Sequence, residues 1–165
     1  MWAKLTESAK STVYYAQEEA RRLNRAEVEP EQFVYGLVST QTGEEVENTA
    51  AARLLVASGV SRALVLQHFE GTPPLNRVEV DFKNVQLSDR SRQLIDLAFA
   101  QQRRLGDGHI GTEHLLLALT QEKVLHEKLA GLGLDSAGVT RRLQELRAAN
   151  QQPWWQVWKR SRLEP

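Results

Sequence analysis

An internal repeat constrains the fold of this chain more than any other feature. Shifting the sequence against itself by 87 − 5 = 82 residues aligns residues 5–38 with residues 87–120 without a gap. Average composition would give about two identical pairs over such a block. Seven are found: Leu5/Leu87, Ala16/Ala98, Arg21/Arg103, Arg22/Arg104, Leu23/Leu105, Glu31/Glu113 and Leu37/Leu119. Self-similarity of this kind marks duplicated structural units, so we expect two copies of one fold.

The repeat continues beyond this block at a second offset. Gly59 aligns with Gly133 at 133 − 59 = 74 residues, and the same offset aligns Leu55 with Leu129 and Val65 with Val139. The change in offset falls on residues 41–48 (QTGEEVEN), which are polar and acidic. Such a stretch is typical of a loop, so we expect a longer loop in the first copy.

Both copies are predicted to be helical. In the first, apolar residues recur every three or four positions, as on one face of an α-helix: Leu5, Ala9, Val13, Ala16, Ala20 and Leu23. Pro30 suits the first turn of a second helix, a third helix over 49–58 would end at Gly59, and Ser61 can cap a fourth. The second copy predicts helices over 88–105 and 112–121, one ending near Gly133, and one capped by Asp135. The prediction is eight helices, four in each copy.

The predicted organisation is one double-repeat domain over residues 1–150. Repeat one covers about residues 5–70, a linker covers 71–86, repeat two covers 87–149, and a basic tail follows at 151–165. The linker begins with the turn-forming residues GTPPLN at 71–76. Within it, residues 78–82 (VEVDF) alternate apolar and polar, which predicts one short strand or an ordered crossover.

Composition excludes several classes of protein. The 21 Lys and Arg residues balance 21 Asp and Glu residues, so no net charge attracts the chain to nucleic acid or acidic lipid. The absence of cysteine excludes disulfides, thiol nucleophiles and Cys-ligated zinc. No apolar stretch reaches the length of a signal peptide or a membrane helix. We therefore expect a cytoplasmic protein that does not bind nucleic acid.

No motif indicates catalysis or a cofactor. The segment GDGHIG at 106–111 fits G-x-G-x-x-G, but a predicted helix precedes it, so a helix-ending turn is favoured over a dinucleotide site. The chain has no P-loop, no G-x-S-x-G and no H-E-x-x-H. Its histidines lack metal-ligand spacing: His68, His109, His114 and His126. We expect neither an enzyme nor a metalloprotein.

The start of the second helix in each copy carries a glutamate. The segments are Glu29-Pro30-Glu31 and Gly111-Thr112-Glu113. A helix N-terminus has unpaired backbone N–H groups and a partial positive charge, so it favours anions. One such glutamate would simply complement the helix dipole. Its presence at equivalent positions in both copies favours a binding role.

The segment GTEHLLLAL at 111–119 resembles the Clp N-terminal domain, which precedes the ATPase modules of Clp-type protein unfoldases. Two further segments share the resemblance, AFAQQRRLG at 98–106 and AQEEARRLN at 16–24, and the doubled layout covers about residues 5–147. The resemblance implies an all-α fold of two four-helix repeats packed about a pseudo-twofold axis. It also implies a non-enzymatic module that recruits substrates and adaptor proteins to an unfoldase paired with a peptidase.

The resemblance also implies binding residues. In members from Gram-positive-type bacteria, the glutamate of G-T-E-H grips the guanidinium of phosphorylated arginine, which points to Glu31 and Glu113. In repeat two the rest of the motif would complete a peptide or phosphoarginine site: Gly111, Thr112 and His114. Repeat one has Glu29 and Pro30 in place of Gly111 and Thr112, which adds a negative charge and removes a donor. We expect repeat two to hold the better site.

The tail leaves several interpretations open. Trp154, Trp155 and Trp158 would lie on one side of a short helix beside basic residues, where they could fold back, anchor a partner or contact a membrane surface. Family members usually continue into ATPase modules, so this chain is either a stand-alone relative or a fragment. The alternative to a substrate- or adaptor-binding module is an accessory subunit. It would dock on the Clp peptidase or unfoldase through these tryptophans and affect assembly.

Overall fold

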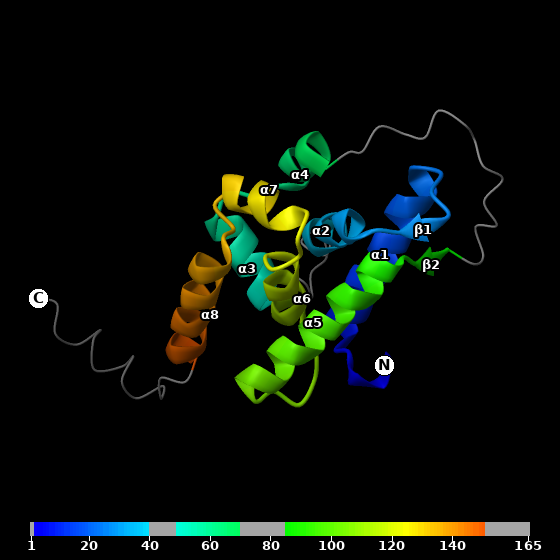
Figure 1. The fold of residues 1–165 in the computed structure, drawn as a ribbon. Helices are drawn as coiled ribbons and strands as arrows, with labels where there is room; N and C mark the ends of the chain where they lie inside the picture. The colour runs from blue at the N-terminus through cyan, green and yellow to red at the C-terminus, as the bar shows by residue number, and fades with distance from the viewer. Residues whose placement is uncertain (1, 40–48, 70–84, 151–165) are drawn as a thin grey trace, which may run out of the picture.

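The computed structural model describes residues 2–39, 49–69 and 85–150, and within these ranges the chain forms eight α-helices, as predicted (Figure 1). The elements are η1 (Trp2–Lys4), α1 (Glu7–Arg22), β1 (Glu27–Val28), α2 (Pro30–Ser39), α3 (Ala50–Ala57), α4 (Arg62–Phe69), β2 (Gln86–Leu87), α5 (Asp89–Leu105), α6 (Thr112–Leu119), α7 (Leu125–Gly131) and α8 (Ser136–Asn150). Several predictions lie outside the described residues: the loop at 41–48, the linker turn at 71–76, the extended segment at 78–82, and Trp154, Trp155 and Trp158.

The helix boundaries follow the capping signals in the sequence. The hydroxyls of Thr6, Thr49 and Ser88 each accept a hydrogen bond of 3.2 Å from the backbone N–H three residues later. Gly106 ends α5 with a left-handed φ of 74°, so GDGHIG begins as a helix-ending turn, as predicted. Helix α6 ends at Leu119, two residues earlier than predicted.

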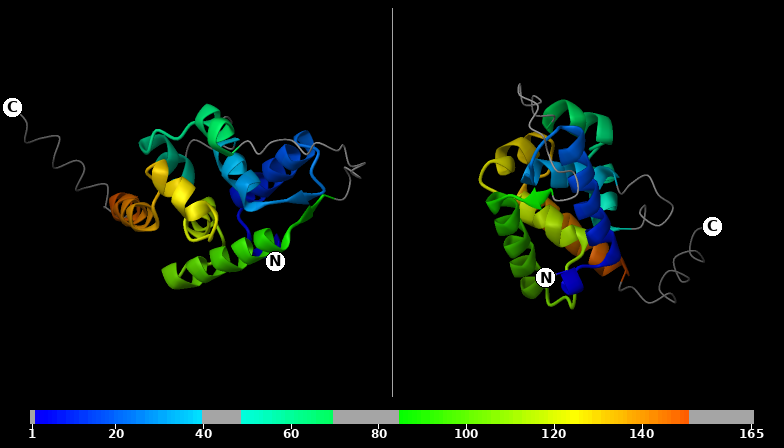
Figure 2. Two further views of the ribbon diagram at one scale, coloured as in Figure 1. Left: turned by 45° about the horizontal axis from the view of Figure 1, so that its top comes forward. Right: turned by 90° about the vertical axis from the view of Figure 1, so that its right-hand side faces the viewer.

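The two central helices form the core. Helices α2 and α6 contact each other, and each also packs against the long first helix of its own repeat, α1 or α5 (Figures 1 and 2). Nine of the ten residues of α2 are buried, and so are seven of the eight residues of α6. The exceptions are Glu31 and Glu113. Burial of both helices on nearly every side explains their continuous apolar runs.

Two short parallel pairings join the repeats, and the sequence did not predict either. Val28 of β1 pairs with Leu87 of β2, and an isolated bridge pairs Leu5 with Ile110. Under the 82-residue offset, Leu5 corresponds to Leu87 and Val28 to Ile110, so each pairing is the image of the other. The hydrogen bonds agree, because Thr6 N donates to Ile110 O at 3.0 Å and Ser88 N to Val28 O at 3.1 Å. Such reciprocity is the signature of a twofold interface, as expected for the pseudo-twofold fold.

The first two helices of repeat one approach especially closely. A Cβ atom added at Gly36 of α2 would overlap the backbone oxygen of Thr12 in α1. The residue of α6 at the equivalent position is Ala118. Glycine at position 36 therefore allows a contact that a side chain would prevent.

None of the described helices alone has the length and apolar composition to cross a membrane. Helices α3 and α4 meet those criteria only when taken together, and they are bent by 80° at the break between them.

Candidate functional site

Each central helix exposes one residue, and that residue is its glutamate. The side chains of Glu31 and Glu113 are 19% and 22% exposed, whereas every other residue of α2 and α6 is buried. The two positions are equivalent under the repeat. The residues around them in the helices serve the core, so these carboxylates are what α2 and α6 present at the surface.

Two helix starts meet beside each glutamate. The β1–β2 pairing brings the start of α5 beside the start of α2, and the bridge between Leu5 and Ile110 brings the start of α1 beside that of α6. In repeat one, the N-cap Ser88 of α5 donates a hydrogen bond of 3.0 Å from Oγ to Glu29 Oε2. Helix starts carry partial positive charge. Each site therefore combines a carboxylate with two helix N-termini, one from each repeat.

The side chain of the residue after each glutamate accepts a hydrogen bond from the backbone at the start of its helix. Gln32 Oε1 accepts a hydrogen bond of 2.8 Å from the backbone N–H of Glu29, and His114 Nδ1 accepts one of 2.8 Å from that of Gly111. These are equivalent halves of a capping box. Because Nδ1 is an acceptor, the ring proton lies on Nε2, which donates to Asp107 Oδ2 at 2.8 Å.

His114 and Thr112 are therefore placed differently from Glu113. Both are buried, with exposures of 1% and 2%. Both ring nitrogens of His114 are engaged within the protein. Of the residues that the motif suggested for repeat two, Glu113 reaches the surface, while Gly111, Thr112 and His114 are buried.

An arginine of the same repeat contacts the carboxylates of repeat two. Arg147 of α8 donates to both oxygens of Asp107, and its Nη2 lies 3.7 Å from Glu113 Oε1. Burial opposes ionisation of Asp107, but hydrogen bonds from Arg147 and His114 outweigh it and hold the pKa of this carboxyl below its usual value.

Asp107, Glu113 and His114 also bring potential metal-ligand atoms within 4.8 Å of one another. The spacing of the histidines in the sequence did not predict this group. His109, which lies five residues before His114, is exposed and is not part of it. Both nitrogens of His114 are already hydrogen-bonded, and Arg147 supplies the positive charge that the carboxylates require. The donor set therefore fits a guanidinium better than a metal ion.

Repeat one binds a guanidinium from the other repeat. Arg90 of α5 lies 3.4 Å from Glu29 Oε2, 3.3 Å from Glu31 Oε1 and 3.1 Å from Glu122 Oε1. Burial opposes the charge on Arg90, but Glu31 and Glu122 outweigh it and raise the pKa of the guanidinium. Sequence reasoning missed Arg90, because its equivalent in repeat one is Ser8 and no repeated pattern marks it.

Glu122 has a second role at the start of α7. Its Oε2 accepts hydrogen bonds from the backbone N–H groups of Val124 at 2.8 Å and Leu125 at 2.9 Å. Burial opposes ionisation of Glu122, but these bonds and Arg90 outweigh it and lower the pKa of the carboxyl. Glu122 thus links the repeat-one cluster to a helix of repeat two.

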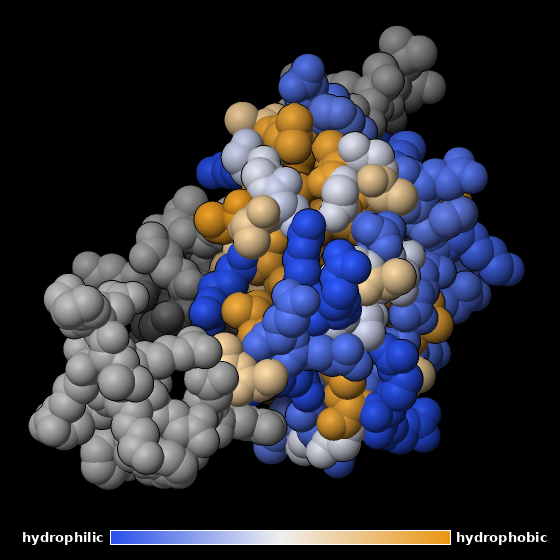
Figure 3. Space-filling view, turned by 90° about the vertical axis from the view of Figure 1, so that its left-hand side faces the viewer, coloured by the Kyte–Doolittle hydropathy of each residue, from blue (hydrophilic) through white to orange (hydrophobic). Residues whose placement is uncertain are grey.

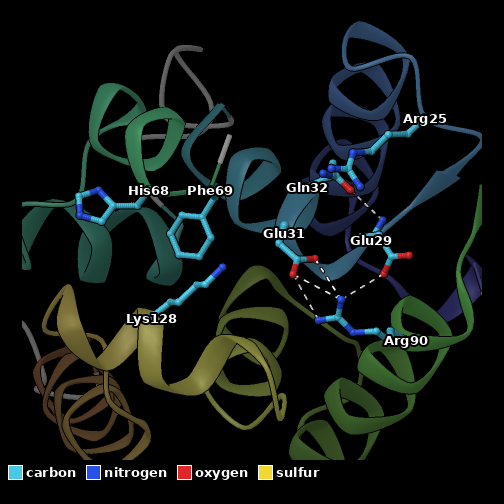
Figure 4. Close-up of a pocket in the computed structure, with 8 residues that line it drawn as sticks. All are labelled: Arg25, Glu29, Glu31, Gln32, His68, Phe69, Arg90 and Lys128. Atoms are coloured by element: carbon cyan, nitrogen blue, oxygen red, sulfur yellow. Dashed lines mark hydrogen bonds and ion pairs between the residues drawn. The ribbon is translucent and has the colours of Figure 1, made fainter. Parts of the chain in front are cut away.

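Gly111 explains why the two glutamates point differently. A Cβ atom added at Gly111 would overlap the carboxylate of Glu113, so glycine lets Glu113 fold back over the helix start. In repeat one the corresponding residue is Glu29, which has the Cβ atom that Gly111 lacks. Glu31 instead points toward Arg90 (Figure 4).

A pocket of about 340 Å³ opens beside Glu31, between the two repeats. Helices α2 and α4 of repeat one and α5 and α7 of repeat two contribute to its lining (Figure 4). Its charged side chains include Glu29 and Glu31 as well as Arg25, Arg90 and Lys128. The repeat-one site is therefore a cavity that contains both signs of charge.

Comparisons with known proteins agree with this architecture. The family profile described as the Clp repeat (R) N-terminal domain matches residues 4–131. The chain is 35% identical over 141 residues to the ATP-dependent Clp protease ATP-binding subunit ClpA homolog of Guillardia theta, covering 82% of this chain and 16% of that protein. It is 31% identical over 140 residues to the negative regulator of genetic competence ClpC/MecB of Bacillus subtilis, covering 85% of this chain and 16% of that protein.

Solved structures share the fold. The Hsp104 N-terminal domain from Candida albicans aligns with a TM-score of 0.69 at 18% identity, covering 87% of this chain and 91% of that domain. The N-terminal domain of the Clp-associated chaperone ClpD from Arabidopsis thaliana aligns with a TM-score of 0.63 at 17% identity, covering 87% and 97%.

Proposed function

Because the chain belongs to the Clp repeat (R) N-terminal domain family, we propose that it is a non-enzymatic module, formed by residues 1–150, that binds substrate or adaptor proteins for a Clp unfoldase. The chain spans only 16% of the length of relatives such as the ClpA homolog, so the activity of those proteins is no part of this proposal. On the face shown in Figure 3, hydrophobic side chains lie in small groups among hydrophilic ones.

The ligand that we propose is arginine phosphorylated on its guanidinium. The observation that carries the proposal is that Glu31 and Glu113, alone among the residues of α2 and α6, are not buried. Both lie next to a guanidinium of the protein itself, Arg90 or Arg147. A carboxylate that accepts an internal guanidinium suits a ligand guanidinium, while the paired helix starts suit its phosphoryl oxygens.

Calorimetric titration with a phosphoarginine peptide tests this proposal. We expect the wild type to bind the peptide and to bind its unphosphorylated counterpart more weakly. Glu113→Ala should weaken binding about tenfold and Glu31→Ala less, because Glu29 adds a negative charge to the repeat-one site. Glu127→Ala, which removes a glutamate that is 86% exposed on α7, serves as the matched control. Equal affinity for the wild type, Glu31→Ala and Glu113→Ala would remove both glutamates from the binding site.

A further inference from the structure

The pocket beside Glu31 separates its charges. On one side, Arg90 lies among the carboxylates of Glu29, Glu31 and Glu122. These acids are thus engaged with a cation that the protein supplies. The other cationic residues of the lining, Arg25 and Lys128, are not surrounded by carboxylates in this way.

Arg25 and Lys128 form no ion pair with any residue in the described ranges 2–39, 49–69 and 85–150. The Nε of Arg25 is buried without a hydrogen-bond partner among these residues. Lys128 of α7 lines the pocket together with Phe69 of α4 (Figure 4). Two cations therefore line the cavity without an ion pair to a described residue, although Glu29 and Glu31 belong to the same lining.

The duplicated scaffold does not require these cations. The residue equivalent to Arg25 is Asp107, and with 128 − 74 = 54 the residue equivalent to Lys128 is Leu54. Asp107 is neutralised by Arg147, and Leu54 is buried in the core. The unpaired cations are thus specific to the repeat-one pocket, and a charged side chain that lacks an internal partner is free to bind an external one.

We propose that Arg25 and Lys128 form an oxyanion subsite that binds the carboxylate or phosphoryl group of a peptide ligand in this pocket. Both cations would make charge-assisted hydrogen bonds to the oxyanion, and Phe69 would contact the apolar part of the same side chain. The subsite lies beside the glutamate of the proposed function but does not depend on it, because it requires no guanidinium in the ligand.

Fluorescence anisotropy with three labelled peptides of equal length tests the subsite. One peptide carries Asp and Glu without arginine, the second carries phosphoarginine, and the third has Gln at every charged position. We expect the full chain to bind the acidic peptide more tightly than the Gln peptide. Lys128→Gln and Arg25→Gln should each weaken this binding about three- to tenfold. Added salt should weaken it as well.

Arg53→Gln is the matched control, because it removes an exposed arginine on α3 that does not line the pocket. Circular dichroism of each variant verifies that it is folded. If Lys128→Gln and Arg25→Gln lose only the acidic peptide, the subsite binds carboxylates; if they lose only phosphoarginine, it binds a phosphoryl group. Unchanged binding of both peptides by both variants would overturn the subsite. Failure of the wild type to bind phosphoarginine, with the acidic peptide still bound, would overturn the proposed function instead.

Discussion

The two repeats share one backbone plan but hold their glutamates in different ways. In repeat two, Glu113 folds back over Gly111 beside an arginine of its own repeat. In repeat one, Glu31 points into a cavity and contacts an arginine of the other repeat. Charged positions around the two sites differ, while core positions such as Phe33 and Leu115 stay apolar in both repeats. The comparison shows that the core preserves the scaffold and that a few surface positions decide which charges meet at each site.

The largest expected effect tests the difference in helix packing. Gly36→Ala should lower the free energy of unfolding by about 3 kcal/mol, because the new methyl group would overlap the backbone of α1 at Thr12. Ala118→Gly, the reverse change at the equivalent position, should cost only about 1 kcal/mol through helix propensity. Urea denaturation measures both. Equal losses would mean that the two helix pairs pack alike.

The next effect tests the two internal guanidinium groups. Arg90→Ala should lower the free energy of unfolding by about 1–2 kcal/mol, since it leaves Glu29, Glu31 and Glu122 without their shared cation. Arg147→Ala should lower the free energy of unfolding by about 1 kcal/mol or less, since it leaves only Asp107 and Glu113 without their cation. Thermal denaturation at low and high salt measures the difference. A larger loss for Arg147→Ala would reverse the comparison.

A smaller effect concerns the loss of folding stability at low pH. Asp107 and Glu122 have lowered pKa values in the folded state, so each stabilises the fold above its usual pKa of 3.8 or 4.5. This stabilisation is lost as pH falls below about 4 through the folded-state pKa. Asp107→Asn should reduce the loss of unfolding free energy between pH 6 and pH 3 by less than about 1 kcal/mol, as measured by urea denaturation. Asp96→Asn, at an exposed position of α5, should leave it unchanged. An acid limb that stays as steep in Asp107→Asn as in the wild type would contradict this role.

The smallest expected effect on stability separates binding from folding. Gly111→Ala should lower the free energy of unfolding by about 0.5 kcal/mol, because alanine is a poorer N-cap than glycine. Its Cβ would nevertheless displace the carboxylate of Glu113, so we expect about threefold weaker binding of a phosphoarginine peptide. Calorimetry on the variant measures this. Unchanged affinity would show that the folded-back position of Glu113 is not the binding position.

Local sequence signals predicted the helices well. Thr6 and Ser88 mark helix starts and Gly106 a helix end, because caps act on neighbours within a few residues. The strands escaped prediction, since two-residue segments such as Glu27–Val28 carry no periodicity and pair with residues of the other repeat.

The motif identified Glu31 and Glu113, yet it could not identify their partners. Arg90 reaches Glu31 across 59 residues and Arg147 reaches Asp107 across 40. Neither arginine is repeated at the equivalent position of the other copy, so the internal repeat gives no signal for them. Contacts of this kind depend on tertiary packing, which the sequence pattern of one helix does not encode.

The matched pairs Leu5–Ile110 and Leu87–Val28 resemble the mirrored contacts of a homodimer placed within one polypeptide. In a homodimer, every substitution appears at both sites at once. Fusion of the two copies removes that constraint, so an arginine can arise at position 25 while an aspartate stands at position 107. One gene can then evolve two unlike recognition surfaces on a single symmetric frame.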